Sequence, residues 1–458
     1  MIHKQLAAMQ NAIILFKLFT FDLWYMTATS YFKIKEFRRR NFIMKPYPSH
    51  LVLYIATLSL LMPLRAHGTD TKQVIAVDAQ PTRWTLSTEN STCQIILTED
   101  QNLTPGYYGP TAGTRPYEAP DWTATIENGT LLREIPYRGG FIDMAPALEV
   151  IFADLARELE LIYQGYEILE EHGHPVLRLD MKDRHYPLAV SEFIRVLPEL
   201  DLLEKWLVLK NIGAEDILIE KAYSGSFLLP QGAYDFIQFS GDWGRESIPR
   251  RSRLTPGSKT IAVRDVRSHQ HAGVFMIRPQ DEIDEFCGAV WFGGPVWAGN
   301  WLITAEVNRM ERTQIVAGIN EWDTSWTLRP GVSFTTPKMI MGCTIGGTAA
   351  ASIALHHYTL DHLLPQPFNT QPSQVLYNSW YATTFHVNEK DQIKLAEIAR
   401  DIGVELFVID DGWFKGRNDD HAGLGDWIPD PQKFPRGLSP MIQKINELGM
   451  DFGIWVEP

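Results

Sequence analysis

The chain has 458 residues, a length that suggests two or three domains, and 45% of its residues are apolar, enough to fill large cores. Its formal net charge of −13 at pH 7 argues against nucleic acid or an anionic membrane surface as a partner. Its three cysteines, Cys93, Cys287 and Cys343, cannot form a disulfide framework. With neither a Cys-x-x-Cys pair nor a His-Cys cluster, the sequence predicts no zinc site, and we expect no cofactor.

The first 68 residues are typical of targeting sequence rather than of a folded domain. Residues 1–43 contain an apolar segment interrupted by charged side chains, which is too polar to predict a membrane span. From Met44 onward, a lysine, the apolar run Leu51–Met62 and the small residues of Ala66–Gly68 are typical of a secretory signal peptide. We expect translation to begin at Met44, so that residues 1–68 are an extension plus a signal peptide. The alternative is a signal anchor that uses both apolar segments.

Three Asn-x-Ser/Thr sequons, at Asn90, Asn102 and Asn128, agree with export. Pro105 follows the second sequon closely and weakens it. If the chain is secreted, we expect at least one of the three to carry a glycan. The predicted product is therefore an extracellular glycoprotein with no membrane association after the signal peptide is cleaved.

Residues 72–345 are predicted to be β structure. Short runs rich in Val, Ile, Leu, Phe and Trp, such as Val274–Ile277, alternate with turn signals such as Pro330-Gly331. Over so long a stretch, this spacing predicts a large antiparallel sandwich. His269 and His271 lie two residues apart, on one face of a strand. They could form a metal pair, but no carboxylate or third histidine is near in the sequence, so we assign no metal site.

A change of pattern at residues 346–373 marks a domain boundary. Thr348–Leu364 is a predicted helix, and Pro365 with the prolines after it ends the helix and forms a linker. Residues 374–458 then alternate between strand and helix, which predicts an α/β barrel or a doubly wound sheet. No Gly-rich phosphate loop follows these strands, which argues against a nucleotide-binding sheet. The predicted elements are the strand Val375–Trp380, a helix capped by Asn388 that ends near Arg400, the strand Leu406–Ile409, a helix capped by Ser439 and the strand Asp451–Val456.

Two adjacent acids, Asp410 and Asp411, follow the strand Leu406–Ile409, whose continuous apolar run predicts burial on both faces. Charged groups in such a place are costly unless something pairs with them. The simplest alternative is a solvated loop with a helix-capping aspartate. The residues that follow favour a sugar-binding site instead, because a polar loop rich in acids extends to Trp427 and the next predicted strand carries Trp455 near its end. Active sites of (β/α) barrels lie at the carboxyl ends of the strands, and acids together with aromatics suit a sugar.

Several blocks of sequence carry a family resemblance through their order and spacing. In the second half they are Asn378–Thr383, Glu405–Trp413, Leu424–Trp427, Leu448-Gly449 and Phe452–Pro458. In the first half they are Tyr137–Phe141, Gly241–Glu246, Ser268–His271 and Pro330–Thr336. From about residue 72 to the end, the chain resembles glycoside hydrolase family 36, the α-galactosidases, and within it the secreted fungal-type branch. The resemblance implies a β supersandwich followed by an incomplete (β/α)8 barrel, of which residues 374–458 are the first three strands.

The resemblance also implies roles for four side chains. Asp410 and Asp411 resemble the pair that accepts hydrogen bonds from the C4 and C6 hydroxyls of galactose, and Trp380 and Trp455 resemble aromatics that line the galactose subsite. We do not assign the two acids as the catalytic pair, because a retaining glycosidase needs carboxyls about 5 Å apart that flank the scissile bond. Neighbours along a strand end point to opposite sides of the backbone. The family's catalytic aspartates lie on later strands, so we expect both beyond Pro458 and assign no catalytic residue here.

The predicted function is retaining hydrolysis of terminal α-galactosyl residues, with α-galactosides such as melibiose as substrates. We expect the 458-residue chain, which is either an incomplete gene product or an incomplete gene model of a full-length enzyme, to be unable to close a barrel and to hydrolyse no substrate. The resemblance allows a homo-oligomer for the full-length enzyme, although the stretch Leu97–Pro105 is shorter than in relatives where it reaches a neighbouring subunit. The alternatives are a non-catalytic sugar-binding fragment and galactosyl transfer like that of raffinose synthases.

Overall fold

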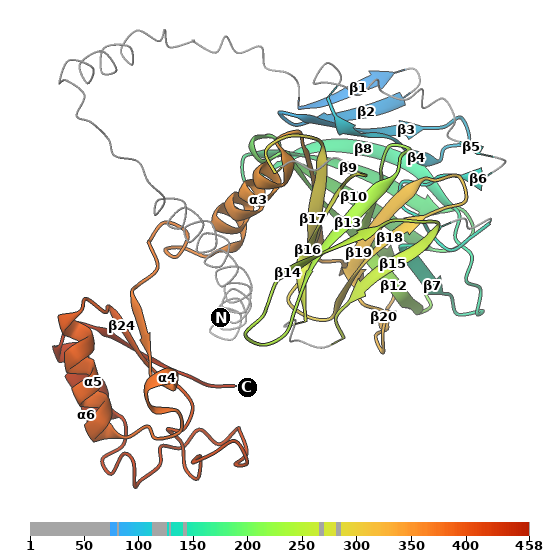
Figure 1. Cartoon of the computed structure of the whole chain (residues 1–458). Coiled ribbons are helices and arrows are strands. Elements are labelled where there is room, and N and C mark those ends of the chain that lie inside the picture. Colours follow the sequence, from blue (N-terminus) through green and yellow to red (C-terminus); the bar gives the residue numbers. More distant parts are fainter. Residues whose placement is uncertain are drawn as a thin grey trace, which may run out of the picture. The chain divides into compact units, whose positions relative to one another are not determined.

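The computed structural model describes residues 74–79, 82–111, 126–127, 130–140, 144–264, 270–280 and 285–457. The chain divides into two compact units, of which unit 1 ends at Leu364 and unit 2 begins at Pro365 (Figure 1). The predicted signal peptide, the sequon at Asn128 and the side chain of His269 lie outside the described residues. Within the described part, no helix is both long enough and apolar enough to cross a bilayer.

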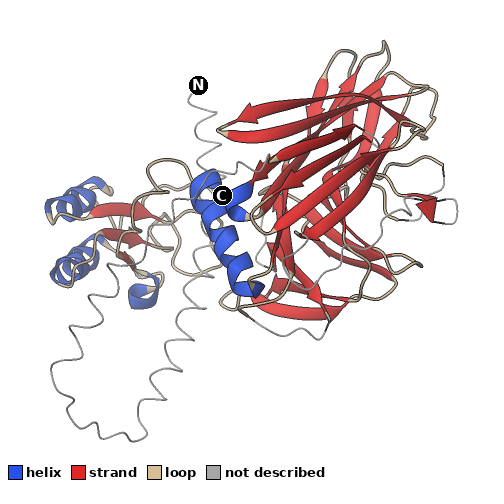
Figure 2. Cartoon of the chain, turned by 90° about the horizontal axis from the view of Figure 1, so that it is seen from above, coloured by secondary structure: helices blue, strands red, loops and turns tan. Residues whose placement is uncertain are grey.

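Unit 1 consists mainly of antiparallel strands, as the sequence predicts (Figure 2). A four-stranded sheet has the order β1-β2-β3-β4: β1 (Ile75–Ala79), β2 (Thr82–Ser87), β3 (Ser91–Leu97) and β4 (Leu103–Pro110). A two-stranded hairpin contains β5 (Ile126–Glu127) and β6 (Thr130–Leu131).

Two larger sheets make up most of unit 1. The ten-stranded sheet has the main order β14-β13-β16-β17-β22-β11-β10-β9-β8, with β21 paired to β11. Its strands are β8 (Leu161–Glu171), β9 (His174–Asp183), β10 (Leu188–Leu197), β11 (Leu202–Asn211), β13 (Tyr234–Ser240), β14 (Ile248–Arg253), β16 (His271–Pro279), β17 (Val290–Val296), β21 (Ser333–Thr335) and β22 (Lys338–Thr344). The six-stranded sheet has the order β15-β18-β19-β12-β20, with β7 paired to β12. Its strands are β7 (Leu148–Ile151), β12 (Ile217–Leu228), β15 (Gly257–Ala262), β18 (Trp301–Val307), β19 (Thr313–Ile319) and β20 (Trp326–Leu328).

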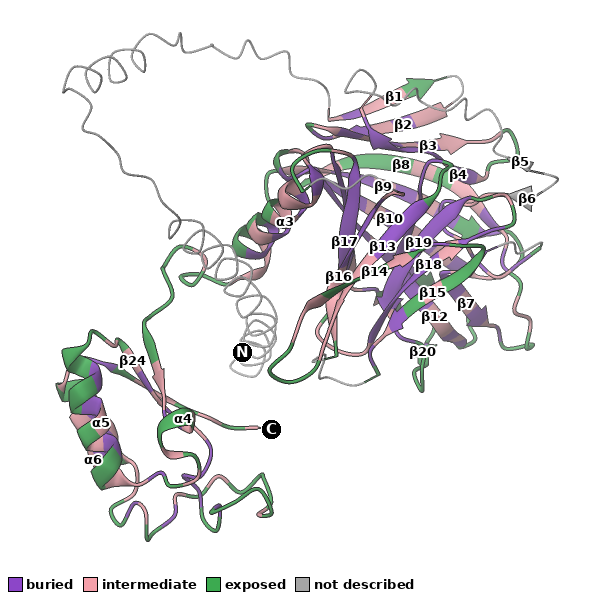
Figure 3. Ribbon diagram, in the orientation of Figure 1, coloured by how far each residue is buried: buried purple, intermediate pink, exposed green. Residues whose placement is uncertain are grey.

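Alternating side chains let these sheets bury a common core. In β10, Leu188, Val190 and Ile194 are fully buried on one face, as the two-residue period of a strand requires. One apolar cluster joins the four-, six- and ten-stranded sheets and contains Trp84 of β2 and Ile303 of β18. Figure 3 shows the buried residues of these strands in purple. Full burial of a large apolar side chain stabilises the fold by about 1.5–3 kcal/mol. The mostly β first half that the sequence predicts is confirmed.

Helix α3 (Gly347–Tyr358) packs on the ten-stranded sheet, because Ala351 and Leu355 share an apolar cluster with Phe292 of β17. A π-helical turn, η2 (Thr359–Leu363), follows it directly. The α-helix is therefore shorter than the sequence predicts, since the π turn replaces its last residues. Both elements belong to unit 1.

Unit 2 is built from parallel strands joined by helices. Its elements are β23 (Leu376–Asn378), α4 (Trp380–Thr383), α5 (Glu389–Asp401), β24 (Leu406–Ile409), α6 (Ser439–Glu447) and β25 (Asp451–Ile454), with the strand order β23-β24-β25. Asn388 caps α5 as predicted, since its side-chain oxygen accepts a hydrogen bond from the Asp391 N–H at 3.0 Å. The predicted cap at Ser439 is wrong: Ser439 is the first helical residue, and Leu438 precedes it without a side-chain cap.

Two other sequence predictions for unit 2 need correction. The predicted strand Val375–Trp380 ends at Asn378, because the Asn378 side-chain oxygen accepts the Trp380 N–H at 2.8 Å and the chain turns into α4. In β24, Phe407 and Ile409 are buried on one face. Leu406 and Val408, on the other face, are only half-buried. The buried face packs with side chains of α5 and α6 in one apolar cluster. Burial on both faces is therefore wrong for the described unit.

A buried charge cluster crosses the core of unit 1. The Lys205 ammonium is 1% exposed; it is paired with the Glu134 carboxylate and lies 3.4 Å from the Glu192 carboxylate. It also donates to the Ser226 carbonyl at 3.0 Å. Burial raises the pKa of Glu192 to about 7; the charge of Lys205 opposes this rise and that of Glu134 adds to it. One cation thus serves two carboxylates, and Glu192 is the one that binds a proton more easily than a free glutamate does.

The raised pKa of Glu192 predicts a pH-dependent contribution to stability. Its folded value of about 7 exceeds the ordinary value of 4.5, so between these limits the folded state binds the extra proton. The stabilising contribution is full below pH 4.5 and is lost as pH rises through about 7. Glu192→Gln cannot ionise at this position. As pH rises from about 5 to 8, we therefore expect its free energy of unfolding, measured in urea, to increase by on the order of 3 kcal/mol relative to that of the wild type.

The matched control is Glu158→Gln, since Glu158 is exposed and outside the buried cluster. Its stability difference from the wild type is expected to stay constant across the same pH range. A difference for Glu192→Gln that is equally independent of pH would contradict the prediction.

Candidate functional site

The carboxyl ends of β23, β24 and β25 lie at one edge of the sheet, because the three strands are parallel and adjacent. They are followed by Trp380, by Asp410 with Asp411, and by Trp455 respectively. The Trp455 N–H donates to the Ile409 carbonyl at 2.9 Å, so the ladder of hydrogen bonds extends to this residue. All four side chains that the sequence analysis assigns to sugar binding therefore start from the same edge.

Asp410 is oriented by the end of the neighbouring strand. Its Oδ2 accepts a hydrogen bond from Asn378 Nδ2 at 2.5 Å, and its backbone N–H donates to Ser379 Oγ at 2.8 Å. Its Oδ1 accepts the Asp411 N–H at 2.7 Å. Each oxygen of a carboxylate offers about two acceptor positions. The half-buried Asp410 thus accepts one hydrogen bond on each oxygen and has capacity for another on each.

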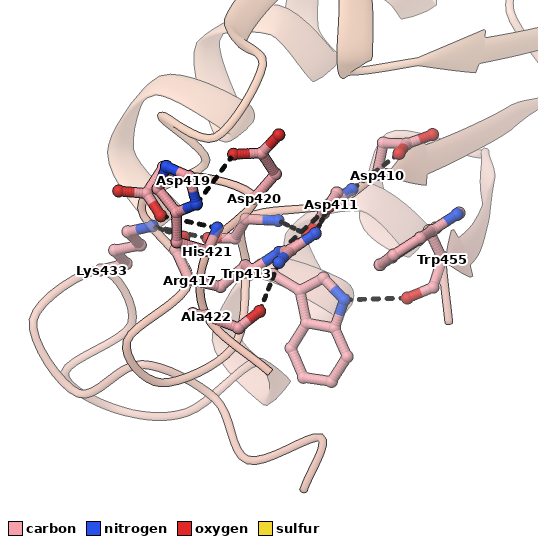
Figure 4. Close-up of polar contacts among 11 residues, drawn as sticks. Asp410, Asp411, Trp413, Arg417, Asp419, Asp420, His421, Ala422, Lys433 and Trp455 are labelled. Carbon is pink, nitrogen blue, oxygen red and sulfur yellow. Dashed lines mark hydrogen bonds and ion pairs between the residues drawn. The ribbon is translucent and has the colours of Figure 1, made fainter. Parts of the chain in front are cut away.

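Asp411 is buried, 5% exposed, and it forms an ion pair with Arg417, which is 7% exposed (Figure 4). Arg417 Nε lies 2.9 and 3.1 Å from the two carboxylate oxygens, and Nη2 donates to Oδ2 at 2.7 Å. The Gly412 N–H donates to Oδ1 at 2.6 Å. Such forked, charge-assisted bonds are among the strongest in proteins. The chain's own donors therefore occupy most of the acceptor capacity of Asp411.

Aromatic side chains come from the same loops and strand ends as the two acids. The Trp413 indole N–H donates to the Trp455 carbonyl at 2.9 Å, which joins the loop after β24 to the end of β25. Trp427 stacks on Trp413 with ring centroids 6.2 Å apart and meets Trp455 edge-on at 6.1 Å. After the end of β23, Trp380 packs edge-on against Phe385, with ring centroids 5.1 Å apart. Trp380 and Trp455 are both half-buried, so each has a surface that can contact a ligand.

Lys433 holds the loop between β24 and α6 from inside. Its ammonium donates to three backbone carbonyls, those of Phe385 at 3.0 Å, Gly412 at 2.7 Å and Arg417 at 2.8 Å. Burial lowers the pKa of Lys433, and the carboxylates of Asp430 and Asp411 oppose this decrease. The lysine therefore acts as a structural clamp on the segments that position Asp411 and Arg417.

The residues that hold the two acids in place are not among those predicted from the sequence. Asn378 and Ser379 fix Asp410, Arg417 pairs with Asp411, and Lys433 clamps the loop. One signal was present: two acids at the end of a buried strand need a cation, and Arg417 is close in the following loop. The amide and hydroxyl of the neighbouring strand carried no comparable signal, since their role depends on strand pairing.

The described sequons differ in how their side chains are used. Asn90 Nδ2, the atom that would carry a glycan, donates to Asp201 Oδ2 at 2.7 Å, and the Asn90 N–H donates to Asp201 Oδ1 at 2.8 Å. Asn102 Nδ2 makes a longer bond of 3.3 Å to the Asp100 carbonyl in the turn between β3 and β4. A glycan on Asn90 would have to replace a short bond to a buried carboxylate. Glycosylation at both positions stays a prediction.

Comparison with known families accounts for nearly all of the described chain. Residues 97–329 match the glycosyl hydrolase family 36 N-terminal domain, and residues 333–458 match melibiase. The chain belongs to glycosyl hydrolase family 36. The family resemblance that the sequence blocks predict is therefore confirmed.

Curated proteins that are similar to this chain include α-galactosidases of bacteria and fungi. The chain is 34% identical over 352 residues to alpha-galactosidase AgaA of Geobacillus stearothermophilus. The alignment covers 73% of this chain and 48% of AgaA. The chain is 31% identical over 364 residues to probable alpha-galactosidase G of Aspergillus terreus. This alignment covers 74% of this chain and 50% of that protein. The chain thus spans about half the length of the curated relatives it matches.

Solved structures of family 36 members have the same fold over the matched region. The α-galactosidase from Lactobacillus brevis superposes with a TM-score of 0.77 at 29% identity, covering 84% of this chain and 56% of that one. A variant of AgaA from Geobacillus stearothermophilus in complex with raffinose gives a TM-score of 0.75 at 29% identity. The superposition covers 82% of this chain and 56% of that one.

Breaking the ion pair between Asp411 and Arg417 is expected to destabilise unit 2 strongly. Removing one partner from a buried pair leaves an uncompensated charge and costs about 3–5 kcal/mol. We expect Arg417→Met to destabilise unit 2 by this amount, Asp411→Asn to do so comparably, and the double variant to cost clearly less than the sum. Hydrogen exchange of peptides from unit 2, followed by mass spectrometry, measures each effect.

Arg436→Met is the matched control. Arg436 is 68% exposed and pairs with Glu389 at the surface, where an ion pair contributes about 1 kcal/mol or less. Additive effects of Arg417→Met and Asp411→Asn, or a loss no larger than that of the control, would show that the pair does not organise the loop.

Proposed function

We propose that this chain supplies the β domain and the galactose-recognising end of a retaining α-galactosidase that acts on terminal α-galactosyl residues of oligosaccharides. In this proposal, unit 1 corresponds to the family's β supersandwich, and β23, β24 and β25 are the first three strands of a (β/α)8 barrel. Membership of family 36 supports both assignments. The single observation that carries the proposal is the oriented Asp410 carboxylate between the strand ends that bear Trp380 and Trp455.

The proposed recognition rests on hydroxyl donors of the sugar. Ionised carboxylates only accept hydrogen bonds, so they suit the C4 and C6 hydroxyls of galactose. Asp410 has free acceptor capacity on both oxygens, whereas Asp411 is largely occupied by Arg417 and Gly412. We therefore assign the larger share of hydroxyl recognition to Asp410. Asp411 contributes its remaining capacity and fixes the loop.

Catalysis needs groups other than these two acids. A retaining glycosidase places two carboxyls about 5 Å apart on either side of the scissile bond. Asp411 donates its N–H to the carboxylate of Asp410, and the Asp411 carboxylate is bound to Arg417, so these two acids are not placed to flank one scissile bond. We propose that the nucleophile and the acid/base residue belong to the part of the enzyme beyond Pro458.

A non-catalytic sugar-binding role is the second candidate for the chain by itself. It is favoured by the same observation, because Asn378, Arg417 and Lys433 hold the recognition residues within unit 2 alone. Both candidate functions require galactose binding, but only the hydrolase would turn over a galactoside. They can therefore be separated with one protein preparation.

Binding of galactose to the 458-residue chain tests the recognition proposal. We expect calorimetric titration to detect galactose and to give weaker binding for glucose, which differs in the orientation of the C4 hydroxyl. Hydrogen bonds to a charged group contribute about 1.5–3 kcal/mol, so Asp410→Asn should weaken galactose binding about tenfold or more. Asp401→Asn, at the exposed last position of helix α5, is the control and should bind as the wild type does. Equal affinities for both sugars would argue against the assignment of Asp410.

Turnover of p-nitrophenyl α-galactoside tests where the catalytic groups lie. We expect none from the 458-residue chain, because its identified acids serve binding and loop structure. Clear turnover that Asp410→Asn leaves intact would place the catalytic groups within this chain and overturn that part of the proposal.

We further propose that the protein is secreted, as the predicted signal peptide and sequons indicate. N-terminal sequencing of the exported product is expected to find a mature end at or just after Gly68. A mature end well before this residue would contradict cleavage at the predicted site.

A further inference from the structure

A cluster of metal-binding side chains lies in unit 1, remote in sequence from the acids of unit 2. His174, Glu199 and His362 each offer one ligand atom, and these atoms all lie within 4.8 Å of one another. His174 begins β9, Glu199 belongs to the short 3-10 helix η1 (Pro198–Leu200), and His362 belongs to the π turn η2. Among the residues that the structure describes, no other group of three such side chains converges in this way.

We propose that His174, Glu199 and His362 form a binding site for a divalent transition-metal ion, with zinc as the expected occupant. Imidazole nitrogens and a carboxylate oxygen are ligands that suit zinc, and three protein ligands plus one water complete a tetrahedral site. Zinc holds such ligands at about 2.0–2.2 Å, which places the ligand atoms themselves about 3.3 Å apart. His174 Nε2 lies 3.8 Å from Glu199 Oε1, and all three ligand atoms lie within 4.8 Å of one another, so side-chain rotations that draw them together are required.

The surroundings leave the ligands room to adjust. The Glu199 side chain is 54% exposed, and that of His174 is 20% exposed. The two imidazole rings lie with centroids 5.6 Å apart and planes inclined by 58°. Exposure of the carboxylate lets it approach an ion without disturbing the core. The partly buried histidines supply the fixed side of the site.

The ring of His362 is held by a chain of contacts that leads into the sheet. It stacks on Tyr358, with centroids 5.3 Å apart and planes inclined by 25°. Tyr358 is 2% exposed, and its hydroxyl donates to the buried carboxylate of Glu204. Glu204 also pairs with Arg195. The stacking therefore restricts the orientation of the His362 ring, as the surroundings of a metal site do for its ligands.

The π turn gives a second, independent reason to consider this place. Turns of this type are rare and occur frequently at functional sites. Because a π turn adds a residue to the helical turn, it changes the direction in which the following side chains project. Here it delivers His362 to the β8–β9 hairpin and η1, and a bound ion would tie the last element of unit 1 to both.

The sequence predicts no metal site, and its one candidate pair of ligands is His269 with His271. The cluster of His174, Glu199 and His362 has no local signal in the sequence, since its members come from three separate segments of the chain. Its predicted role is structural: an ion here would stabilise the end of unit 1. The proposal does not depend on sugar binding or on hydrolysis.

Metal titration of the tag-free, chelator-treated 458-residue chain tests the proposal. We expect calorimetry to give one zinc ion per chain, thermal unfolding to shift to higher temperature on zinc addition, and cobalt(II) to give the visible absorption of a tetrahedral site. His174→Gln, Glu199→Gln and His362→Gln should each weaken zinc binding by about 100-fold or more, since even supporting residues contribute about 10–100-fold. Circular dichroism without metal checks that each variant folds.

His172→Asn is the matched control. His172 lies in the same hairpin, is 78% exposed and has a φ of +53°, a conformation that asparagine tolerates. It should bind zinc as the wild type does. Absence of stoichiometric zinc binding and of the tetrahedral cobalt spectrum in the wild type would overturn the proposal, even if a variant failed to fold. Equal zinc affinity of the control and the three ligand variants would also overturn it.

Discussion

The ion pair between Asp411 and Arg417 is the contact on which the organisation of unit 2 depends. Both groups are buried, so the cost of removing their charges from water is offset only because the guanidinium binds the carboxylate through several short hydrogen bonds. Arg417 also donates to the Ala422 carbonyl, and its own carbonyl accepts from Lys433. A single carboxylate at the end of β24 therefore fixes the course of the polar loop that follows it.

This arrangement divides the work between two neighbouring acids. Asp411 gives most of its acceptor capacity to the chain, whereas Asp410 is oriented by Asn378 and keeps capacity on both oxygens. The difference follows from the strand itself, because adjacent side chains at its end point to opposite sides. One side meets the loop, and the other lies beside the ends of β23 and β25. Adjacent acids thus become unequal through the donors that each one meets.

Local signals in the sequence were sufficient to predict most elements of unit 2. The cap at Asn388 and the apolar run of β24 depend on residues close in the chain, and both are present. The end of β23 was misplaced, because the bond from Trp380 N–H to Asn378 depends on a specific rotamer rather than on strand propensity. Arg417 could have been inferred from the need to pair a buried acid. The cluster of Lys205 with Glu192 could not, since strand pairing brings those residues together.

Unit 1 uses buried charge in the same way at the point where a helix meets a sheet. Glu204 pairs with Arg195 and accepts the Tyr358 hydroxyl, so it joins two strands to the end of α3. An apolar contact alone would let the helix slide along the sheet, because dispersion and hydrophobic burial have little directionality. A buried carboxylate with two fixed donors permits one alignment, since any other leaves a charge unpaired. The position of His362 beyond Tyr358 is then a consequence of this alignment, as is its meeting with His174.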